Sequence, residues 1–188
     1  MKHNIASIII AVVIGGLAGI CHYNSAYAKQ KVEVKVIEAI PYESNHEEKI
    51  LIRDVDIPLE VQLAAEKYGE EYNICPELLE AIAYYESTWK PEVDSKNGKY
   101  KGLMQISQRW HQARMDKLGV TDLHDADQNM HVAADYLADL YEKYEDTSIV
   151  LMAYNGDHSY KDGNISKYAK KIMKKSAELE EKHKKMVL

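Results

Sequence analysis

Apolar residues before position 86 recur at the spacing of an α-helix, and this pattern constrains the fold more than any other feature of the chain. Leu79, Ile82 and Ala83 stand at positions i, i+3 and i+4, which lie on one face of a helix. Glu86 occupies position i+7 of the same face. We therefore expect a helix that ends near Glu86 and carries this acid among its core-facing residues.

The remaining chain also predicts helices. Residues 59–72 are rich in helix formers, and Pro76 suits the first turn of the helix that follows them. Asp125 is a suitable N-cap for a long helix in which apolar residues recur at helical spacing. Shorter helical patterns cover residues 148–152 and 165–173. The domain shows no internal repeat and no convincing alternating strand, so the predicted class is all-α.

The two ends of the chain differ from its middle in composition. A length of 188 residues suits one compact domain with additional segments at its ends. Lys2, a long apolar run and the small-residue pattern Ala26-Tyr27-Ala28 indicate a signal peptide or an N-terminal membrane anchor, and hence export from the cytoplasm. The expected segments are 1–28 as signal or anchor, 29–56 as linker, 57–175 as the domain and 176–188 as a charged C-terminal tail.

Charge and metal-ligating residues exclude several classes of function. The formal net charge is −6 with acidic and basic residues interspersed, whereas nucleic-acid binding requires a basic stripe. The eight histidines are scattered, and no His, Cys or Asp cluster has metal-ligand spacing. Cys75 shows no recognisable histidine partnership of a thiol nucleophile. We expect no metal, no cofactor and no nucleic-acid partner.

Glu86 is the candidate catalytic residue. A carboxyl group on the buried face of a helix loses water, which disfavours its charged form and raises its pKa. A raised pKa is the property that a general acid requires at neutral pH. A buried glutamate paired with a cation is the commoner explanation for such a residue in isolation. Here Ser87 follows directly, Gly102-Leu103-Met104-Gln105 follows a polar loop, and Ala153-Tyr154-Asn155-Gly156 ends a helix.

Together with Tyr168, these three motifs resemble the soluble lytic transglycosylase family, which has the goose-type lysozyme fold. The resemblance covers roughly residues 57–173 and implies a lysozyme-like helical domain with a substrate groove for peptidoglycan glycan strands. It implies cleavage of the β-1,4 bond between N-acetylmuramic acid and N-acetylglucosamine. Glu86 matches the single glutamate of the family, which first protonates the glycosidic oxygen. It then accepts the proton of the muramic C6 hydroxyl, giving a 1,6-anhydro product.

The resemblance also implies substrate-binding roles for side chains around the acid. These are Ser87, Met104, Gln105, Tyr154, Asn155 and Tyr168. Ser87 would orient the acid or contact the substrate, Tyr168 would lie near the acid, and the others would line the sugar groove or flank the reactive position. Amides and hydroxyls match the hydrogen-bonding edge of a sugar, while aromatic and methionine side chains match its apolar face. In isolation, core packing is the better explanation of Tyr154, and a helix stop is the better explanation of Asn155.

Two other functions stay open at this stage. A muramidase that uses water needs a second catalytic group, commonly a carboxylate, and the nearest candidate, Asp94, has the composition of a turn around it. A wall-binding or assembly module without catalysis is the other alternative, because Gly156 follows Asn155 directly where the family has one more residue. If the N-terminal segment is an uncleaved tether, the enzyme would remodel the wall locally, for secretion or conjugation machinery or during wall remodelling.

Overall fold

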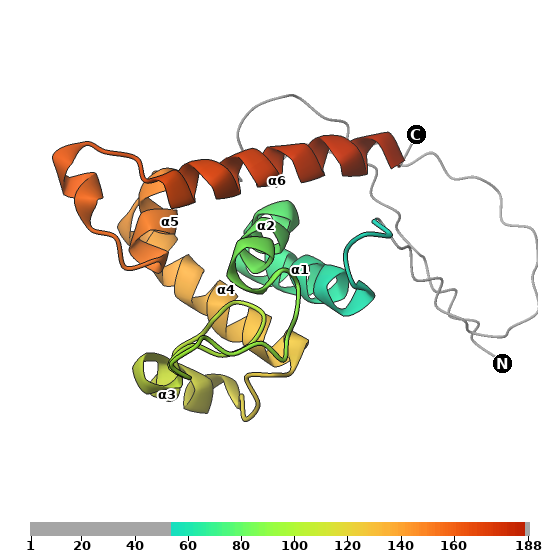
Figure 1. Cartoon of the computed structure of the whole chain (residues 1–188), viewed down its shortest axis with the longest axis vertical. Coiled ribbons are helices and arrows are strands. Elements are labelled where there is room, and N and C mark those ends of the chain that lie inside the picture. The colour runs from blue at the N-terminus through green and yellow to red at the C-terminus, as the bar shows by residue number, and fades with distance from the viewer. Residues whose placement is uncertain (1–53, 187–188) are drawn as a thin grey trace, which may run out of the picture.

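The computed structural model describes residues 54–186 of the chain (Figure 1). The expectations for residues 1–28 and for most of the 29–56 linker lie outside the described residues. Within the described part, six α-helices and one short 3-10 helix account for the regular structure, and two isolated β-bridges are the only extended pairings. The predicted all-α class is confirmed. The elements are α1 Leu59–Tyr72, α2 Pro76–Ser87, α3 Gln108–Leu118, α4 Ala126–Lys143, α5 Thr147–Tyr154, η2 Ser159–Asp162 and α6 Lys167–Met186.

Helix α2 lies at the centre of the arrangement. It contacts α6 on one side and α1 on the other, and α1 packs in turn against α4 (Figure 1). A helix that is covered on two sides must be apolar around most of its circumference. Accordingly Leu79, Ile82 and Ala83 are fully buried, and so is Ala81 on a different face of α2. The stripe that leads to Glu86 therefore faces the core as predicted.

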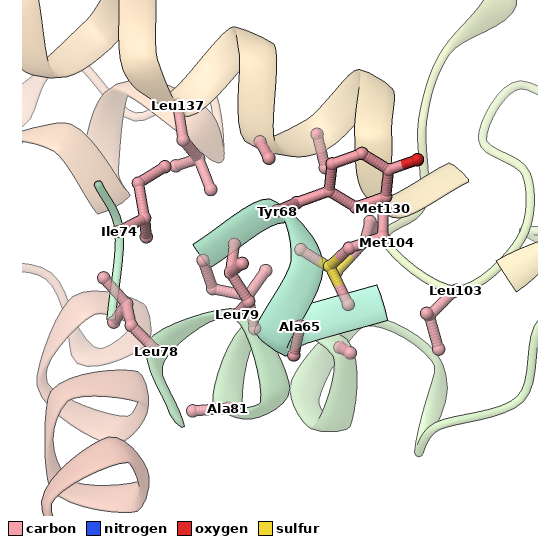
Figure 2. Close-up of a cluster of buried hydrophobic side chains, with 14 of the residues drawn as sticks. Ala65, Tyr68, Ile74, Leu78, Leu79, Ala81, Leu103, Met104, Met130 and Leu137 are labelled. Carbon is pink, nitrogen blue, oxygen red and sulfur yellow. The ribbon is translucent and has the colours of Figure 1, made fainter. Parts of the chain in front are cut away.

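Figure 2 shows the cluster of side chains that joins α1, α2, α4 and the 102–106 loop. Leu79, Met104, Met130 and Leu137 are each fully buried in it. Fully burying an aliphatic side chain of this size contributes about 1.5–3 kcal/mol to folding. The Tyr68 ring lies in the same cluster, and its hydroxyl donates to Asp127 Oδ2 at 2.8 Å. The core therefore holds the loop that contains Met104 against the helix that carries Glu86.

The sequence did not predict α3. Met115 is the one residue of this helix that is buried, so no apolar stripe at helical spacing marks the segment. The helix ends at Gly119, which adopts a left-handed φ of 69°. α3 packs against α4 as a mostly solvated helix.

The C-terminal segment differs from the expected charged tail at 176–188. Helix α6 continues through it to Met186, and Leu179 and His183 are buried. Ile172, Ser176, Leu179 and His183 follow one another at intervals of four, three and four residues, so one face of a highly charged helix packs inward.

The same contact brings residues of the expected linker into the packed domain. Lys182 Nζ donates to Asp54 Oδ1 and to Asp56 Oδ2, each at 2.7 Å. Asp54 is buried and also accepts from Gln62 Nε2 through its backbone carbonyl at 2.6 Å. The packed domain therefore includes Asp54, ahead of the expected start at Ile57. In the part of the chain that the structure describes, no helix is both long and apolar enough to cross a bilayer.

Candidate active site

Glu86 lies in the last turn of α2 and is partly buried. Burial raises the pKa of its carboxyl group, although a hydrogen bond from Tyr168 opposes part of this effect. The Tyr168 hydroxyl donates to Glu86 Oε1 at 2.5 Å. Among the described residues no lysine, arginine or histidine forms an ion pair with Glu86, so a buried ion pair does not account for this acid.

Tyr168 reaches the acid from α6, 82 positions along the chain. Burial first, and then the negative charge of Glu86, raise the pKa of the Tyr168 hydroxyl. The hydroxyl therefore keeps its proton and remains a donor across the whole working range of pH. The packing of α6 on α2 is what brings this donor to the acid.

The end of α2 is fixed by an unusual backbone turn. Thr88 and Trp89 both adopt left-handed φ values, 55° and 59°, which non-glycine residues rarely do. The Trp89 indole N–H donates to the Glu80 carbonyl at 2.8 Å, and the Thr88 amide donates to the Tyr84 carbonyl at 2.9 Å. These contacts hold the turn, so the helix stops immediately after Glu86 and Ser87.

Tyr154 closes another side of the site from the C-terminal end of α5. Its hydroxyl donates to the Met104 carbonyl at 2.8 Å. Burial, followed by the charge of Glu86, raises the pKa of Tyr154 far above its ordinary value. The Met104 side chain is fully buried in the core (Figure 2), which corrects the expectation that it lines a sugar groove. Met104 contributes to the site through its backbone.

The loop at 102–105 depends on a glycine. Gly102 has φ +71°, and a Cβ atom there would lie 1.9 Å from the Leu123 carbonyl oxygen. Gln105 also adopts a left-handed φ, 49°, and its Nε2 donates to the carbonyls of Val93 and Gly102 at 2.8 and 2.9 Å. Both donors of the Gln105 amide therefore hold the loop, and its carbonyl oxygen is the atom left to accept a further hydrogen bond.

Asn129 is a site-supporting residue that the sequence reasoning missed. It is fully buried and accepts from the Met104 amide at 2.8 Å. Its Nδ2 donates to the carbonyls of Leu123 and Lys101 at 2.7 and 3.0 Å. The signal was present, because Asn129 stands three residues after Ala126 and four before Ala133, on the buried stripe of a helix where a polar residue needs partners.

Ser87 and Asn155 occupy different environments. Ser87 is buried, its Oγ donates to the Ala83 carbonyl at 3.2 Å, and it accepts from the Lys90 amide at 3.1 Å. These bonds go to the backbone and none goes to Glu86, which corrects the expectation that Ser87 orients the acid. Asn155 caps α5 and is exposed. Its side chain forms no hydrogen bond with the described residues and is open to a ligand.

The described residues offer neither a metal centre nor an evident second acid. Within residues 54–186, no group of three or more His, Cys, Asp or Glu side chains is arranged to hold a metal ion. Asp94, the candidate second acid, is exposed and lies 2.7 Å from His124 Nε2. It also joins Lys101 in an isolated β-bridge. These contacts agree with a structural role of Asp94 in the loop.

A helical domain that holds a partly buried glutamate with a raised pKa against a tyrosine donor is typical of proteins that use general acid chemistry on a polar substrate. Comparison with known proteins gives the family. Residues 64–177 match the family described as the transglycosylase SLT domain, and the chain belongs to this family. The resemblance seen in the sequence is thereby confirmed.

Individual relatives cover different shares of their own length. The chain is 36% identical over 117 residues to a membrane-bound lytic murein transglycosylase F of Enterobacter sp. (strain 638), a match that covers 58% of this chain and 21% of that protein. It is 40% identical over 85 residues to the protein of the same name from Pseudomonas putida (strain GB-1), covering 42% and 16%. It is 37% identical over 126 residues to the invasion protein IagB of Salmonella typhi, covering 63% and 76%. The chain thus spans about a fifth of the membrane-bound relatives and most of the invasion protein.

Proposed function

We propose that this protein is a peptidoglycan lytic transglycosylase. It would cleave the β-1,4 bond between N-acetylmuramic acid and N-acetylglucosamine and leave a 1,6-anhydromuramic end. The observation that carries the proposal is Glu86, an acid whose pKa is raised by burial and whose hydrogen-bond partner is an uncharged tyrosine. Membership of the transglycosylase SLT domain family and the names of the murein transglycosylase relatives support it.

The first step uses Glu86 as a general acid. Its raised pKa keeps a larger fraction of the carboxyl protonated near neutral pH than in a solvated glutamate. Tyr168 donates to Oε1, so Oε2 is the oxygen that carries the transferable proton. As the glycosidic C1–O bond breaks, this proton passes to the departing oxygen. The Tyr168 hydroxyl then stabilises the carboxylate that forms on Glu86.

The second step uses the same residue as a base. The C6 hydroxyl of the muramic sugar attacks C1, the new C6–O–C1 bond closes the anhydro ring, and the hydroxyl proton returns to Glu86. The acid is regenerated and no water is consumed. This scheme needs one carboxyl group, whereas retaining and inverting hydrolases need two. The pairing of Asp94 with His124 supports the single-acid scheme over a hydrolytic muramidase.

The surrounding residues have distinct proposed roles. The Gln105 carbonyl oxygen and the exposed Asn155 amide would hydrogen-bond the N-acetyl and hydroxyl groups of the sugars. Tyr154 would flank the reactive sugar with its ring, as its position next to Glu86 suggests. Tyr168 would position and stabilise the acid. Met104 would act through its backbone carbonyl, which Tyr154 binds, and the Ser87 hydroxyl would support the end of α2.

The test is mass spectrometry of the products released from purified peptidoglycan by the full chain. Anhydro products, lighter by one water than reducing-end products, are expected from the wild type and absent with Glu86→Gln. Glu92→Gln, which changes an exposed loop glutamate, is the matched control and should cleave normally. Reducing ends would instead identify a muramidase. Binding to the wall without any product from the wild type would identify a non-catalytic module.

We also propose that the protein acts outside the cytoplasm, with residues 1–28 as signal peptide or anchor. The words "membrane-bound" and "invasion protein" in the names of relatives support an envelope location and a link to secretion or other wall-crossing machinery. Mass spectrometry of the protein purified from its host distinguishes the two forms. A mature N-terminus at Lys29 corresponds to a secreted enzyme, and an intact Met1 in the membrane fraction corresponds to a tethered one. Recovery of the intact chain in the cytoplasm would contradict export.

A further inference from the structure

A row of aromatic rings leads from the candidate active site to α3. The Tyr154 ring lies 5.6 Å from the Tyr136 ring of α4, measured between centroids, and the Tyr136 ring lies 4.7 Å from the His111 ring of α3. All three residues are partly exposed. The row begins at Tyr154, whose pKa the charge of Glu86 raises, and continues over two further helices.

The outer members of this row have polar atoms that the protein does not use. Neither the Tyr136 hydroxyl nor the His111 ring forms a hydrogen bond with the described residues. Most other partly buried tyrosines are bonded through their hydroxyls, namely Tyr72, Tyr141, Tyr144, Tyr154, Tyr160 and Tyr168. Tyr84 is the exception among the described residues, and its ring packs against Tyr85 and Trp89. No polar atom of Tyr136 or His111 is among the fully buried ones that lack a partner. These atoms therefore reach solvent.

The row is held in place and carries no charge of its own at neutral pH. The Arg114 guanidinium lies 5.4 Å from the centroid of the Tyr136 ring and is itself bonded to Asp135 and Asp139. Burial, and then the charge of Arg114, lower the pKa of His111, so its imidazole is neutral. Rings fixed by packing lose little conformational entropy when they bind a ligand.

We propose that His111 and Tyr136 form a further saccharide-binding site for the peptidoglycan glycan strand, on the α3 side of the bond that Glu86 cleaves. This inference rests on the proposed function. A sugar ring has an apolar face and a polar edge. A partly exposed aromatic ring can pack against the face, and its free donor or acceptor can hydrogen-bond the edge. Continuity with Tyr154 and the neutrality of the aromatic rings favour the sugar rings of the strand over its charged peptide stems as the occupant.

The test measures binding and cleavage separately. Binding of amidase-stripped, peptide-free glycan strands is measured by calorimetry with the full chain carrying Glu86→Gln, so that no strand is cut. His111→Ala and Tyr136→Ala are each expected to weaken this binding about tenfold, the equivalent of one lost ring contact. Tyr136→Phe keeps the packing of the ring and should lose only the share that its hydroxyl contributes. Trp110→Ala removes an exposed ring adjacent to His111 in sequence and outside the row, and is expected to leave binding unchanged.

The same substitutions in the chain with intact Glu86 should raise KM for peptidoglycan while kcat changes little, because they act away from the reacting bond. Unchanged binding and KM in both alanine variants, with a wild type that cleaves, would overturn this inference alone. Loss of binding with Trp110→Ala but not with His111→Ala would also overturn it. A wild type that releases no product while its His111→Ala variant loses strand binding would refute the proposed activity and retain the saccharide site. Circular dichroism melting confirms that each variant is folded.

Discussion

The two ends of the contact between α2 and α6 hold carboxyl groups in opposite ways. At one end, Glu86 meets only the hydroxyl of Tyr168, and burial raises its pKa. At the other end, Glu77 lies 3.0 Å from His183 Nδ1, and the buried Asp54 lies 2.7 Å from Lys182 Nζ. Burial alone would raise the pKa of Asp54, but the hydrogen bonds from Lys182 and the Asp56 amide, together with the Lys182 charge, lower it. The lysine partner therefore favours the charged form of Asp54, whereas Glu86, the proposed catalytic acid, has an uncharged donor and a raised pKa.

The largest effect is expected when the glutamate at either end of this contact, Glu86 or Glu77, is replaced by glutamine. Glu86→Gln should lower kcat on peptidoglycan by about 10²–10⁴-fold, because the general acid is lost. Its thermal stability should rise slightly at pH 7, since a carboxyl whose pKa is raised by folding destabilises the folded state above its unfolded-state pKa. Glu77→Gln is the matched change at the other end and should lower stability while preserving kcat. Equal loss of activity in both variants would contradict the division of roles.

A second test measures how much the close packing of the 102–105 loop contributes to the stability of the fold around the candidate active site. Gly102→Ala should destabilise the protein by about 2–4 kcal/mol, because its Cβ would overlap the Leu123 carbonyl and its φ is left-handed. Gly98→Ala shares the positive φ but has open space around it, so it should cost about 1 kcal/mol. Urea unfolding measures both. Similar losses would mean that close packing at Gly102 does not hold the loop.

A third test removes the donor from the reactive acid. The Tyr168 hydroxyl bond lowers the pKa of Glu86, so Tyr168→Phe should raise that pKa further. Activity falls as pH rises through the pKa of the acid, and the alkaline limb should therefore move to higher pH. The variant should also lose about tenfold or more in kcat, because a hydrogen bond to a charged group contributes about 1.5–3 kcal/mol.

Tyr141→Phe is the control for Tyr168→Phe, since it removes a hydroxyl bonded to Thr147 elsewhere in the fold. Its pH profile of peptidoglycan cleavage should match that of the wild type. An unshifted profile in Tyr168→Phe would contradict direct action of this hydroxyl on Glu86.

The smallest expected effect is a change in stability when the ion pair between Lys182 and Asp54 is broken. Lys182→Met should cost about 1 kcal/mol at pH 7, limited by the partial exposure of the lysine. Because folding lowers the pKa of Asp54, the stabilisation is present above the unfolded-state pKa and is lost as pH falls through the folded-state value. The difference between wild type and variant should therefore vanish in strong acid. Lys185→Met, which breaks a fully solvated pair with Glu181, should change stability by less than Lys182→Met at pH 7.

The local sequence pattern predicted most of the helices and the position of Glu86. It failed for features that depend on contacts between residues far apart in the chain. The apolar stripe of α2 placed Glu86 correctly, since about two helical turns are enough to define a helix face. The resemblance to family motifs predicted Met104 as a site residue. It did not reveal that Met104 contributes its backbone carbonyl, which accepts the hydrogen bond from Tyr154. Ser87 was likewise predicted to act through its hydroxyl, but this hydroxyl is hydrogen-bonded to the Ala83 carbonyl at the end of α2.

Other features escaped because they depend on partners distant in sequence. Asn129 is explained by a loop 25 positions away, and the packing of His183 by acids more than a hundred positions away. Helix α3 escaped for a different reason, because it buries one residue and presents no periodic stripe. The proposed saccharide row was invisible in the sequence, since it takes one ring from each of three helices.

Helix α6 forms side-chain contacts with the rest of the domain near both of its ends. These contacts determine where the chain tolerates insertions and deletions. The 20 residues of α6 span about 30 Å at 1.5 Å per residue. Tyr168 forms its hydrogen bond in the first turn, and Lys182 and His183 form theirs near the last turn. The direction in which the Tyr168 side chain points is therefore set by α6 itself. Residues gained or lost between Gly156 and Ser166 change the loop without turning Tyr168 from Glu86. A single residue inserted within α6 would rotate one set of these contacts by about 100° relative to the other. The direct succession of Asn155 and Gly156 is thus a change that the loop absorbs while the acid keeps its donor.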